Sequence, residues 1–479
     1  MTRDHLDLRS WLAAVRQLRL GAVVVLALGT STLMLLSPAA QAVPPFARQT
    51  GLACEACHIV PPELTAFGRR FKMNGYTLTT RPPLVTDIDD HKKNTVWLTD
   101  LPGIGILLQA TYNQYNRAPP DSAVAGAKAA SGTLQYPQQY SFIGAGAITD
   151  HIGAFLQVTY LQPAGTFGID NNEIRYSDHT DNNDWVWGVL ANNNPGNQDV
   201  WNSIAAYPVP DFSNQSLWSA PVIDGASLRT PFYTGLGGLV AGPTAYVWYK
   251  DSFYLGFSEY YAAKSGSVST QLDSTNLSVG GGTVQDWAPY WRAAYEYDWG
   301  YNAMMIGTNG MYTKFTPYEI AGQTLDPGFI NRYLDLSYDW QYQYNGQHNN
   351  FSFLGRFTHE TEENDPGLVP TYFSNSVDKL NEWNVTAEYY YNRHYGGMIN
   401  FVRANGTNDV AFNGGNGSPG HQYEVFELDY LPWFNMRFML QYNVYQVVNN
   451  NQNPFFLLKA SNPKASDNNT WDLGLWMDF

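Results

Sequence analysis

The chain has little charge, only two cysteines and a single long apolar run. Charged residues make up 14% of its 479 residues, and 42 acidic residues outnumber 27 basic ones. This balance argues against a nucleic-acid-binding protein, which needs a basic face. Two cysteines cannot crosslink a chain of this length, which excludes a disulfide scaffold. The negative mean hydropathy excludes a bundle of membrane helices, and 15% aromatic residues argue against a disordered chain. A large soluble β protein or an outer-membrane barrel is left.

Residues 1–42 have the pattern of a secretory signal peptide. Four arginines precede a mostly apolar stretch from Leu20 to Leu36, and Ala40-Gln41-Ala42 supplies the small residues of a cleavage site. The alternative is a single membrane anchor of about 17 residues. The helix-breaking Pro38 and the small residues after it favour cleavage, so we expect the mature chain to begin at Val43.

Beyond about residue 100, apolar and polar residues alternate in segments of roughly ten residues. Successive side chains of a strand point to opposite faces, so such a segment has one apolar and one polar face. The clearest example places Leu334, Leu336, Tyr338, Trp340, Tyr342 and Tyr344 on one face and Asp335, Ser337, Asp339, Gln341 and Gln343 on the other. We expect sixteen strands, which start near residues 103, 139, 153, 171, 185, 236, 252, 286, 301, 331, 350, 380, 396, 422, 435 and 470.

The connections between these segments alternate between short and long. Tight turns such as Asp150-His151 and Asn345-Gly346 alternate with polar stretches, among them 193–235 and 362–379. Outer-membrane barrels have this pattern, with tight periplasmic turns and long external loops. The last strand ends at Phe479 and resembles the closing strand of outer-membrane porins. The sequence therefore predicts an all-β protein, a transmembrane antiparallel barrel over residues 97–479 whose termini both lie on the periplasmic side.

Both cysteines lie in one motif, Cys54-Glu55-Ala56-Cys57-His58. This spacing is the attachment signature of c-type haem, in which two thiols form thioethers with the porphyrin and the histidine ligates the iron. A redox-active disulfide and a zinc site are the alternatives. The first would not need His58, and the second lacks enough soft ligands nearby. We therefore predict one covalent haem c on Cys54, Cys57 and His58.

The motif does not determine which residue is the second axial ligand of this haem. Met73 is the nearest candidate, because a thioether favours ferrous iron and raises the potential; alternatively, it only packs against the porphyrin. The other candidates are His91 and three methionines of the barrel, Met311, Met398 and Met439. Aromatic residues that could pack on the ring are Phe46, Phe67, Phe71 and Tyr76, and basic residues that could pair with propionates are Arg48, Arg69, Arg70 and Lys72.

The haem segment, residues 43–96, is about 54 residues long, which is marginal for an independent core. We expect it to dock inside the barrel, because docking would bury the segment and plug the pore.

Two stretches of this segment resemble a known family. They are Phe46-Ala47-Arg48-Gln49-Thr50-Gly51-Leu52-Ala53-Cys54-Glu55-Ala56-Cys57-His58 and Pro62-Glu63-Leu64-Thr65-Ala66-Phe67-Gly68-Arg69-Arg70-Phe71-Lys72-Met73-Asn74-Gly75-Tyr76. They resemble the fused cytochrome–porin family, the outer-membrane monohaem iron(II) oxidases of iron-oxidising bacteria. The resemblance covers about 30 residues. It implies a haem c on Cys54, Cys57 and His58, with no catalytic residue beyond the haem, but it leaves Met73 open because that position varies in the family.

The resemblance also implies a function. Electrons from extracellular Fe(II) would pass through the haem to a periplasmic cytochrome c or blue-copper protein, which makes the chain an oxidoreductase of the outer membrane. Possible iron-binding carboxylates lie on a predicted external loop, at Glu360, Glu362, Glu363 and Asp365, and near another segment end, at Asp170, Asp181 and Asp184. The alternative is a solute porin whose haem segment senses redox state or gates flow.

Overall fold

The computed structural model describes residues 45–78, 103–116, 132–161, 166–203, 240–262, 282–317, 319–320, 323–325, 328–413, 417–447 and 465–479. The predicted signal peptide and His91 lie outside these residues. Within the described residues, no helix is long and apolar enough to cross a membrane.

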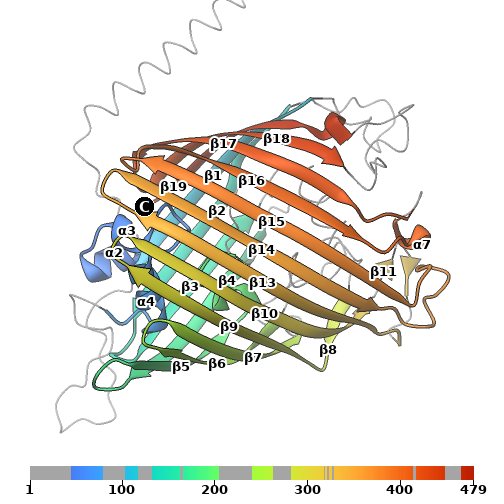
Figure 1. Cartoon of the computed structure of the whole chain (residues 1–479), viewed down its shortest axis with the longest axis horizontal. Helices are drawn as coiled ribbons and strands as arrows, with labels where there is room; N and C mark the ends of the chain where they lie inside the picture. The colour runs from blue at the N-terminus through green and yellow to red at the C-terminus, as the bar shows by residue number, and fades with distance from the viewer. Residues whose placement is uncertain are drawn as a thin grey trace, which may run out of the picture. The chain divides into compact units, whose positions relative to one another are not determined.

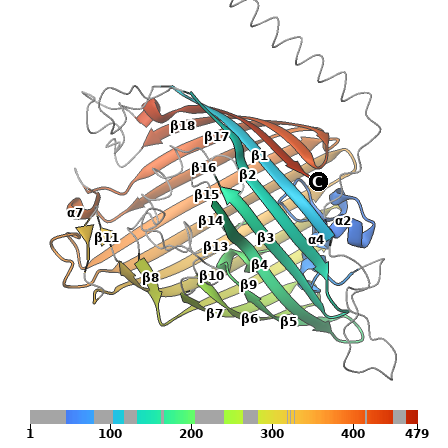
Figure 2. The same cartoon turned by 180° about the vertical axis from the view of Figure 1, so that it is seen from behind.

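Antiparallel strands form a closed barrel (Figures 1 and 2). They are β1 (Gly103–Tyr115), β2 (Gly132–Ala147), β3 (Ile152–Leu161), β4 (Thr166–His179), β5 (Trp185–Asn192), β6 (Val240–Tyr249), β7 (Phe253–Ala262), β8 (Gly282–Gln285), β9 (Trp287–Trp299), β10 (Asn302–Pro317), β13 (Asn331–Asn345), β14 (Asn349–Glu363), β15 (Val377–Tyr391), β16 (Tyr395–Gly406), β17 (His421–Trp433), β18 (Met436–Val447) and β19 (Thr470–Asp478). A small separate hairpin consists of β11 (Glu319–Ile320) and β12 (Gln323–Thr324).

The barrel has sixteen strands, because β8 and β9 are two parts of one strand. Asp286, which separates them, has a positive φ of 57°, and both parts pair with β10. The ring closes where β1 pairs with both β2 and β19. The predicted class and strand number are therefore confirmed. β2 and β4 begin earlier than predicted, because their ladders continue into residues whose composition is typical of loops.

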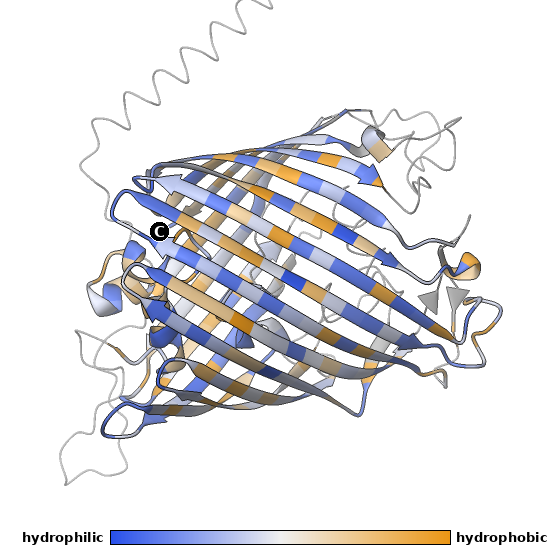
Figure 3. Cartoon of the chain, viewed as in Figure 1, coloured by the Kyte–Doolittle hydropathy of each residue, from blue (hydrophilic) through white to orange (hydrophobic). Residues whose placement is uncertain are grey.

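The two faces of the wall differ in polarity. On β13, Asp335, Ser337 and Asp339 are at most 2% exposed and face the interior, whereas Leu334 and Tyr338 on the alternate face are exposed. Figure 3 shows this alternation of polar and apolar residues along the strands. A closed barrel with an apolar outer face satisfies its backbone hydrogen bonds internally and can lie in lipid. The chain is thus an outer-membrane-type barrel with a polar lumen.

The end of the barrel with the short turns carries a helical segment, residues 45–78. It contains α2 (Pro45–Thr50), α3 (Cys54–Cys57) and α4 (Ala66–Met73). Figures 1 and 2 show these helices beside the end of β19. Arg393, in the turn between β15 and β16, donates a hydrogen bond of 3.2 Å to the carbonyl of His58. The segment, the start of β1 and the end of β19 therefore lie at the same end.

The prediction of an external loop over residues 193–235 is wrong for its first part. Residues 193–203 follow β5 and were expected to extend outward as the start of a polar loop. Instead they contain the short 3-10 helix η1 (Pro195–Gln198) and turn into the lumen, where Trp201 is fully buried. They fold inward because their polar side chains bond to lumen-facing residues, as when Gln198 donates to the hydroxyl of Thr244 over 3.0 Å.

Candidate functional site

The cysteine motif forms one helical turn whose end is held by α4. The amide of His58 donates to the carbonyl of Cys54 over 2.9 Å, and the amide of Thr65 donates to the carbonyl of Cys57 over 2.9 Å. Thr65 also caps α4: its hydroxyl accepts from the amide of Gly68 and donates to the carbonyl of Ala56. The cap thus fixes α3 and α4 relative to each other.

Gly68 permits this close packing. A Cβ atom at this position would lie 2.2 Å from the carbonyl oxygen of Cys57, a backbone atom that cannot rotate away. A side chain of any size at position 68 would therefore separate α4 from the cysteine motif.

The surroundings of His58 keep its imidazole neutral. Burial lowers the pKa of His58 to about 4, opposed by backbone groups of Pro62 and Glu63. Its Nδ1 atom is buried and has no hydrogen-bond partner among the described residues. A neutral imidazole is the form that ligates a metal.

The two thiols are not set up for redox catalysis. Both cysteines are free and half-buried. Burial raises the pKa of Cys54, and it raises that of Cys57 to about 11. A redox-active pair needs a lowered thiol pKa. A zinc site is also unsupported, because the described residues contain no group of three or more His, Cys, Asp or Glu placed to hold a metal ion.

The motif and its surroundings fit a covalent haem. Two thiols and a neutral imidazole are the donor set that this group requires. Leu52 and Phe67, near the motif in sequence, are 37% and 40% exposed, so apolar surface remains there for a porphyrin. Cys54 and Cys57 would hold the group covalently and His58 would ligate its iron.

A buried ion pair anchors the helical segment in the lumen. Arg69 of α4 is 0% exposed, and its Nε lies 2.9 and 3.0 Å from the two carboxylate oxygens of Glu296 on β9. Its Nη1 donates to the carbonyl of Leu64 over 2.7 Å and to Gln343 over 2.8 Å. A paired guanidinium of this kind gives both charge neutralisation and fixed geometry.

Glu63 makes a second anchor, on β13 and β14. Its Oε1 accepts from Gln341 over 3.0 Å, from Gln343 over 2.8 Å and from the hydroxyl of Ser352. Its Oε2 is buried without a partner among the described residues. Burial raises the pKa of Glu63, although these bonds and nearby Arg69 oppose the shift.

The inward-folded residues after β5 form a third anchor. The indole of Trp201 donates to Glu296 over 2.5 Å, its carbonyl accepts from Gln341 over 2.8 Å, and Asn202 accepts from the amide of Leu64 over 3.3 Å. The guanidinium of Arg292 lies 4.8 Å from the centre of the Trp201 ring. These contacts of Trp201 were not predicted from the sequence. The one feature that could have indicated them is a large apolar side chain within the polar residues 193–203.

The segment also touches the barrel backbone directly. A Cβ atom at Gly153 of β3 would lie 2.0 Å from the carbonyl oxygen of Gly75. Gly75 itself has a positive φ of 68°, just beyond the end of α4. For residues 45–78 of the predicted segment, docking inside the barrel is therefore confirmed, and the rest of residues 43–96 lies outside the described residues.

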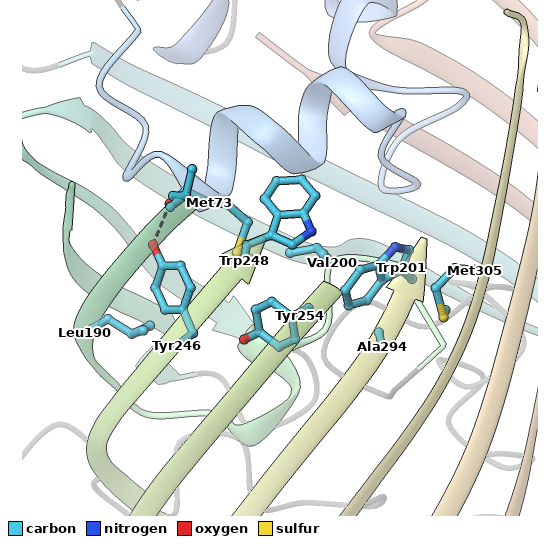
Figure 4. Close-up of a cluster of buried hydrophobic side chains, with 10 residues drawn as sticks. Met73, Leu190, Val200, Trp201, Tyr246, Trp248, Tyr254, Ala294 and Met305 are labelled. Atoms are coloured by element: carbon cyan, nitrogen blue, oxygen red, sulfur yellow. Dashed lines mark hydrogen bonds between the residues drawn. The ribbon is translucent and has the colours of Figure 1, made fainter. Parts of the chain in front are cut away.

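Met73, the predicted second axial ligand, contacts the barrel wall. It is 1% exposed and packs in a cluster with Trp201, Tyr246 and Trp248 (Figure 4). Its carbonyl accepts from the hydroxyl of Tyr246, and its sulfur lies 3.7 Å from Nη1 of Arg175. Ligation of an iron by this thioether would require it to leave these neighbours, so the assignment stays a prediction.

The other residues that the sequence offered as haem contacts have partners within the protein or, in the case of Phe67, lie exposed. Phe46, Phe71 and Tyr76 pack on one another, with ring centroids 4.8 to 5.7 Å apart, while Phe67 lies exposed. The four basic residues have protein partners: Arg48 donates to the carbonyl of Ile104, Arg69 pairs with Glu296, Arg70 pairs with Asp251, and Lys72 lies 4.0 Å from Glu173. Met311, Met398 and Met439 are buried at inward positions of β10, β16 and β18.

The carboxylates considered for iron do not form the expected groups. Glu360 and Glu362 lie within β14, both 0% exposed, because that strand continues through the predicted loop. Asp170 lies in β4 towards its long-loop end, whereas Asp181 and Asp184 lie in the turn at the other end. The predicted external position is therefore wrong for Glu360 and Glu362, whereas Glu363 is exposed at the end of β14 and Asp365 follows that strand.

Comparisons with known proteins concern the barrel. A scan against protein-family models gave no match, and neither did a search of the curated proteins. Among solved structures, the chain is similar to OmpT of Vibrio cholerae (10% identity, TM-score 0.43, 78% of this chain and 96% of that one). It is also similar to OmpF of Salmonella typhi in complex with daunomycin (14%, 0.44, 78% and 97%) and to an anion-selective porin of Comamonas acidovorans (13%, 0.40, 78% and 98%).

Proposed function

We propose that this protein is an outer-membrane c-type cytochrome that oxidises extracellular Fe(II) and passes the electron to a periplasmic carrier. The observation that carries the proposal is the Cys54–His58 motif, held in the mouth of a closed barrel by buried contacts. A motif on a flexible tether would not need Arg69 and Glu63 buried against the wall.

The residues of the motif have separate tasks. A haem c supplies reversible one-electron chemistry when bound. Cys54 and Cys57 hold it covalently, and His58 presents a neutral imidazole because burial lowers its pKa to about 4. The barrel wall separates the two aqueous compartments, so an electron can cross the membrane without its metal ion. Each ferrous ion loses one electron, the carrier gains one, and the ferric product stays outside.

The lumen favours a cationic donor. Its wall carries buried carboxylates, such as Glu360, Glu362 and Glu382, and fewer buried arginines, such as Arg356. Excess negative charge in a confined lumen attracts cations and repels anions. The oxygen atoms of these carboxylates are hard ligands, and they bind ferrous iron better than they bind a soft metal ion.

The orientation of the barrel suits the acceptor. In barrels of this type the short turns are periplasmic and the long loops external. The helical segment lies at the short-turn end, where a soluble cytochrome c or blue-copper protein could reach it.

Stopped-flow spectroscopy of the oxidised protein mixed with Fe(II) tests the proposal. We expect the reduced haem spectrum to appear. The double variant Cys54→Ser/Cys57→Ser is the matched control, because it keeps the barrel and removes covalent attachment. A wild-type protein that carries haem but is not reduced by Fe(II) would exclude the iron oxidase.

The second candidate is a solute porin whose haem segment gates flow. It is favoured by the polarity of the inner wall of the barrel, to which Asn309, Ser337 and Thr358 contribute. Planar-bilayer recordings separate the two functions. A wild-type conductance that is open, or that opens and closes with the redox state of the protein, would favour solute transport, whereas a wild type that stays closed in both redox states would favour the electron-transfer protein.

A further inference from the structure

Glu63 reaches further into the barrel than the cysteine motif does. The carbonyl of His58 accepts a hydrogen bond from Arg393, which lies in the turn between β15 and β16. The carboxylate of Glu63 instead accepts from Gln341 and Ser352, which lie within β13 and β14. Glu63 is therefore on the lumen side of the motif, the side from which an external ion would come.

A second carboxylate, that of Glu388, lies beside Glu63. Ser352, whose hydroxyl donates to Glu63, pairs in register with Glu388 of β15. Both residues of this pair are on the inner face, where the Cβ atoms of opposite residues are about 5 Å apart. Glu388 is 4% exposed, and Glu63 is the charged group that acts on it most strongly. Two buried carboxyls thus meet next to the haem motif.

One oxygen atom of this pair has no protein partner. Oε2 of Glu63 is buried and accepts no hydrogen bond from the described residues, and the whole residue is 1% exposed. A buried polar atom normally has a partner, so its absence needs an explanation. Two buried carboxylates also repel each other unless a proton or a cation lies between them. The pair of Glu63 and Glu388 therefore needs a positive partner.

The guanidinium groups that act on this pair are bonded to other carboxylates. Arg69 lies 2.9 and 3.0 Å from the two carboxylate oxygens of Glu296 on β9. Arg437 donates to Asp429 over 3.0 Å and also to Glu427, both on β17. The positive charges of the two arginines are thus already matched, and an additional cation would balance the pair.

We propose that Glu63 and Glu388 bind the ferrous ion on the lumen side of the haem motif and so position the electron donor. The proposal rests on the proposed function and assigns its substrate a site. Carboxylate and water oxygens are the ligands that suit hard divalent ions. Two carboxylates leave most of the coordination to water, as suits a substrate rather than a resident metal. In agreement, the described residues contain no group of three or more His, Cys, Asp or Glu placed to hold a metal ion.

Asp472 is a matched control for Glu388. Successive register pairs from β15 to β19 place the two residues in one row on the inner face. Asp472 is also buried, at 1% exposure, but its two carboxylate oxygens accept from Asn113 and Asn443. The two carboxyls thus share charge and burial, and they differ in whether protein donors already bind them.

Binding of Mn(II) to the purified full-length protein tests the site without iron. Mn(II) prefers oxygen ligands and does not reduce the haem, and the EPR signal of the free ion falls when it binds. We expect wild type to bind Mn(II) saturably, Glu388→Gln to bind it about tenfold more weakly, and Asp472→Asn to bind it like wild type.

Stopped-flow reduction by Fe(II) is the second measurement. Glu388→Gln should raise the Fe(II) concentration that gives the half-maximal rate by the same factor of about ten. The covalent haem content and the midpoint potential should stay as in wild type, because Glu388 does not contact the motif. A general loss of negative charge from the lumen would instead affect Asp472→Asn equally.

The outcomes separate the site from the proposed function. An unchanged Mn(II) affinity in Glu388→Gln, or an equal loss in Asp472→Asn, overturns the site and leaves the iron oxidase standing. A wild type that binds no Mn(II) also overturns it, because the pair then shares only a proton. Binding of Mn(II) that depends on Glu388, in a haem-loaded protein that Fe(II) does not reduce, supports the cation site and contradicts the iron oxidase. If Glu388→Gln does not fold, Glu63→Gln decides, since an unchanged Mn(II) affinity in that variant excludes the pair.

Discussion

The barrel and the helical segment in its mouth are stabilised in different ways. Each barrel strand is hydrogen-bonded to a neighbour on both sides, and the ring closes between β1 and β19. The helical segment has three short helices, of which α4 with eight residues is the longest. Such short helices are marginal alone, so the segment depends on its contacts with the lumen.

This difference determines where single substitutions act. Removal of one side chain from the wall leaves the backbone ladders in place. The segment, in contrast, is held by a few buried polar contacts, chiefly those of Arg69, Glu63 and Trp201. Substitutions at these residues should release the segment while the barrel stays folded, and the predictions below separate the two regions.

The largest effect is expected for Arg69→Met. It leaves the buried carboxylate of Glu296 without its cation, which costs about 3–5 kcal/mol. We expect the segment to undock from an intact barrel. Limited proteolysis should then cleave near residue 78, while the barrel keeps its resistance to unfolding in detergent.

Arg70→Met is the control for that experiment. The neighbouring Arg70 pairs with Asp251, but its side chain is 56% exposed. Exposed ion pairs contribute about 0–1 kcal/mol. Equal protease sensitivity of the two variants would show that the buried pair is not the anchor.

The second prediction concerns the barrel alone. Leu473 lies near the middle of β19 and is 54% exposed on the outer face. A lysine or arginine at the centre of the lipid-facing band costs about 2–4 kcal/mol and near the interface about 0–1 kcal/mol. Leu473→Lys should therefore lower the unfolding free energy in lipid vesicles, and Tyr301→Lys, in a turn, should not. Protease resistance of the docked segment should be unchanged in both, and its loss would argue that the regions are coupled.

The fold of the barrel could be predicted because its signals are local. Alternation along Leu334–Tyr344 assigns each side chain to lipid or lumen, and the structure agrees, with Asp335 and Ser337 fully buried inside. The terminal Phe479 was predicted to end the closing strand, and its amide donates to the carbonyl of Ile106 of β1. A period of two residues needs no knowledge of distant partners.

The docking of the segment could be predicted only in outline. Its small size required burial, but the partners of Arg69 and Glu63 lie more than 220 residues away along the chain. No local pattern identifies Glu296 as an anchor or Gly153 as a point of backbone contact. The inward turn of residues 193–203 was missed for the same reason, because polar composition is shared by external loops and by segments that fill a polar lumen.

The third prediction is Gly68→Ala. Within a helix this change usually stabilises by about 0.5–1 kcal/mol. Here the added Cβ would lie 2.2 Å from the carbonyl oxygen of Cys57, so we expect a net loss of about 1–3 kcal/mol, as for overpacking. Haem content per purified barrel, measured by pyridine haemochrome absorbance, should fall.

Gly144→Ala on β2 is the control for that substitution, since a Cβ there has nothing within 4 Å. It should leave haem content unchanged. A Gly68→Ala protein with normal haem content would show that the close contact between α3 and α4 is not needed for attachment.

The smallest effect is a dependence of docking on pH through Glu63. Burial raises the pKa of this carboxyl above its ordinary value of 4.5, so the docked segment retains a proton that the released segment has lost. The contribution of Glu63 to docking is therefore strongest in acid and weakens as the pH rises from about 4.5 towards the raised pKa, with a slope of at most about 1.4 kcal/mol per pH unit. Glu63→Gln, which is neutral at every pH and keeps the oxygen that accepts from Gln341 and Gln343, should remove this slope. Protease release of the segment, measured across that range for both proteins, decides the matter. Parallel curves for wild type and Glu63→Gln would assign the pH dependence to another group, whereas a difference between the two curves that grows as the pH rises would show that the buried carboxyl of Glu63 strengthens docking in acid.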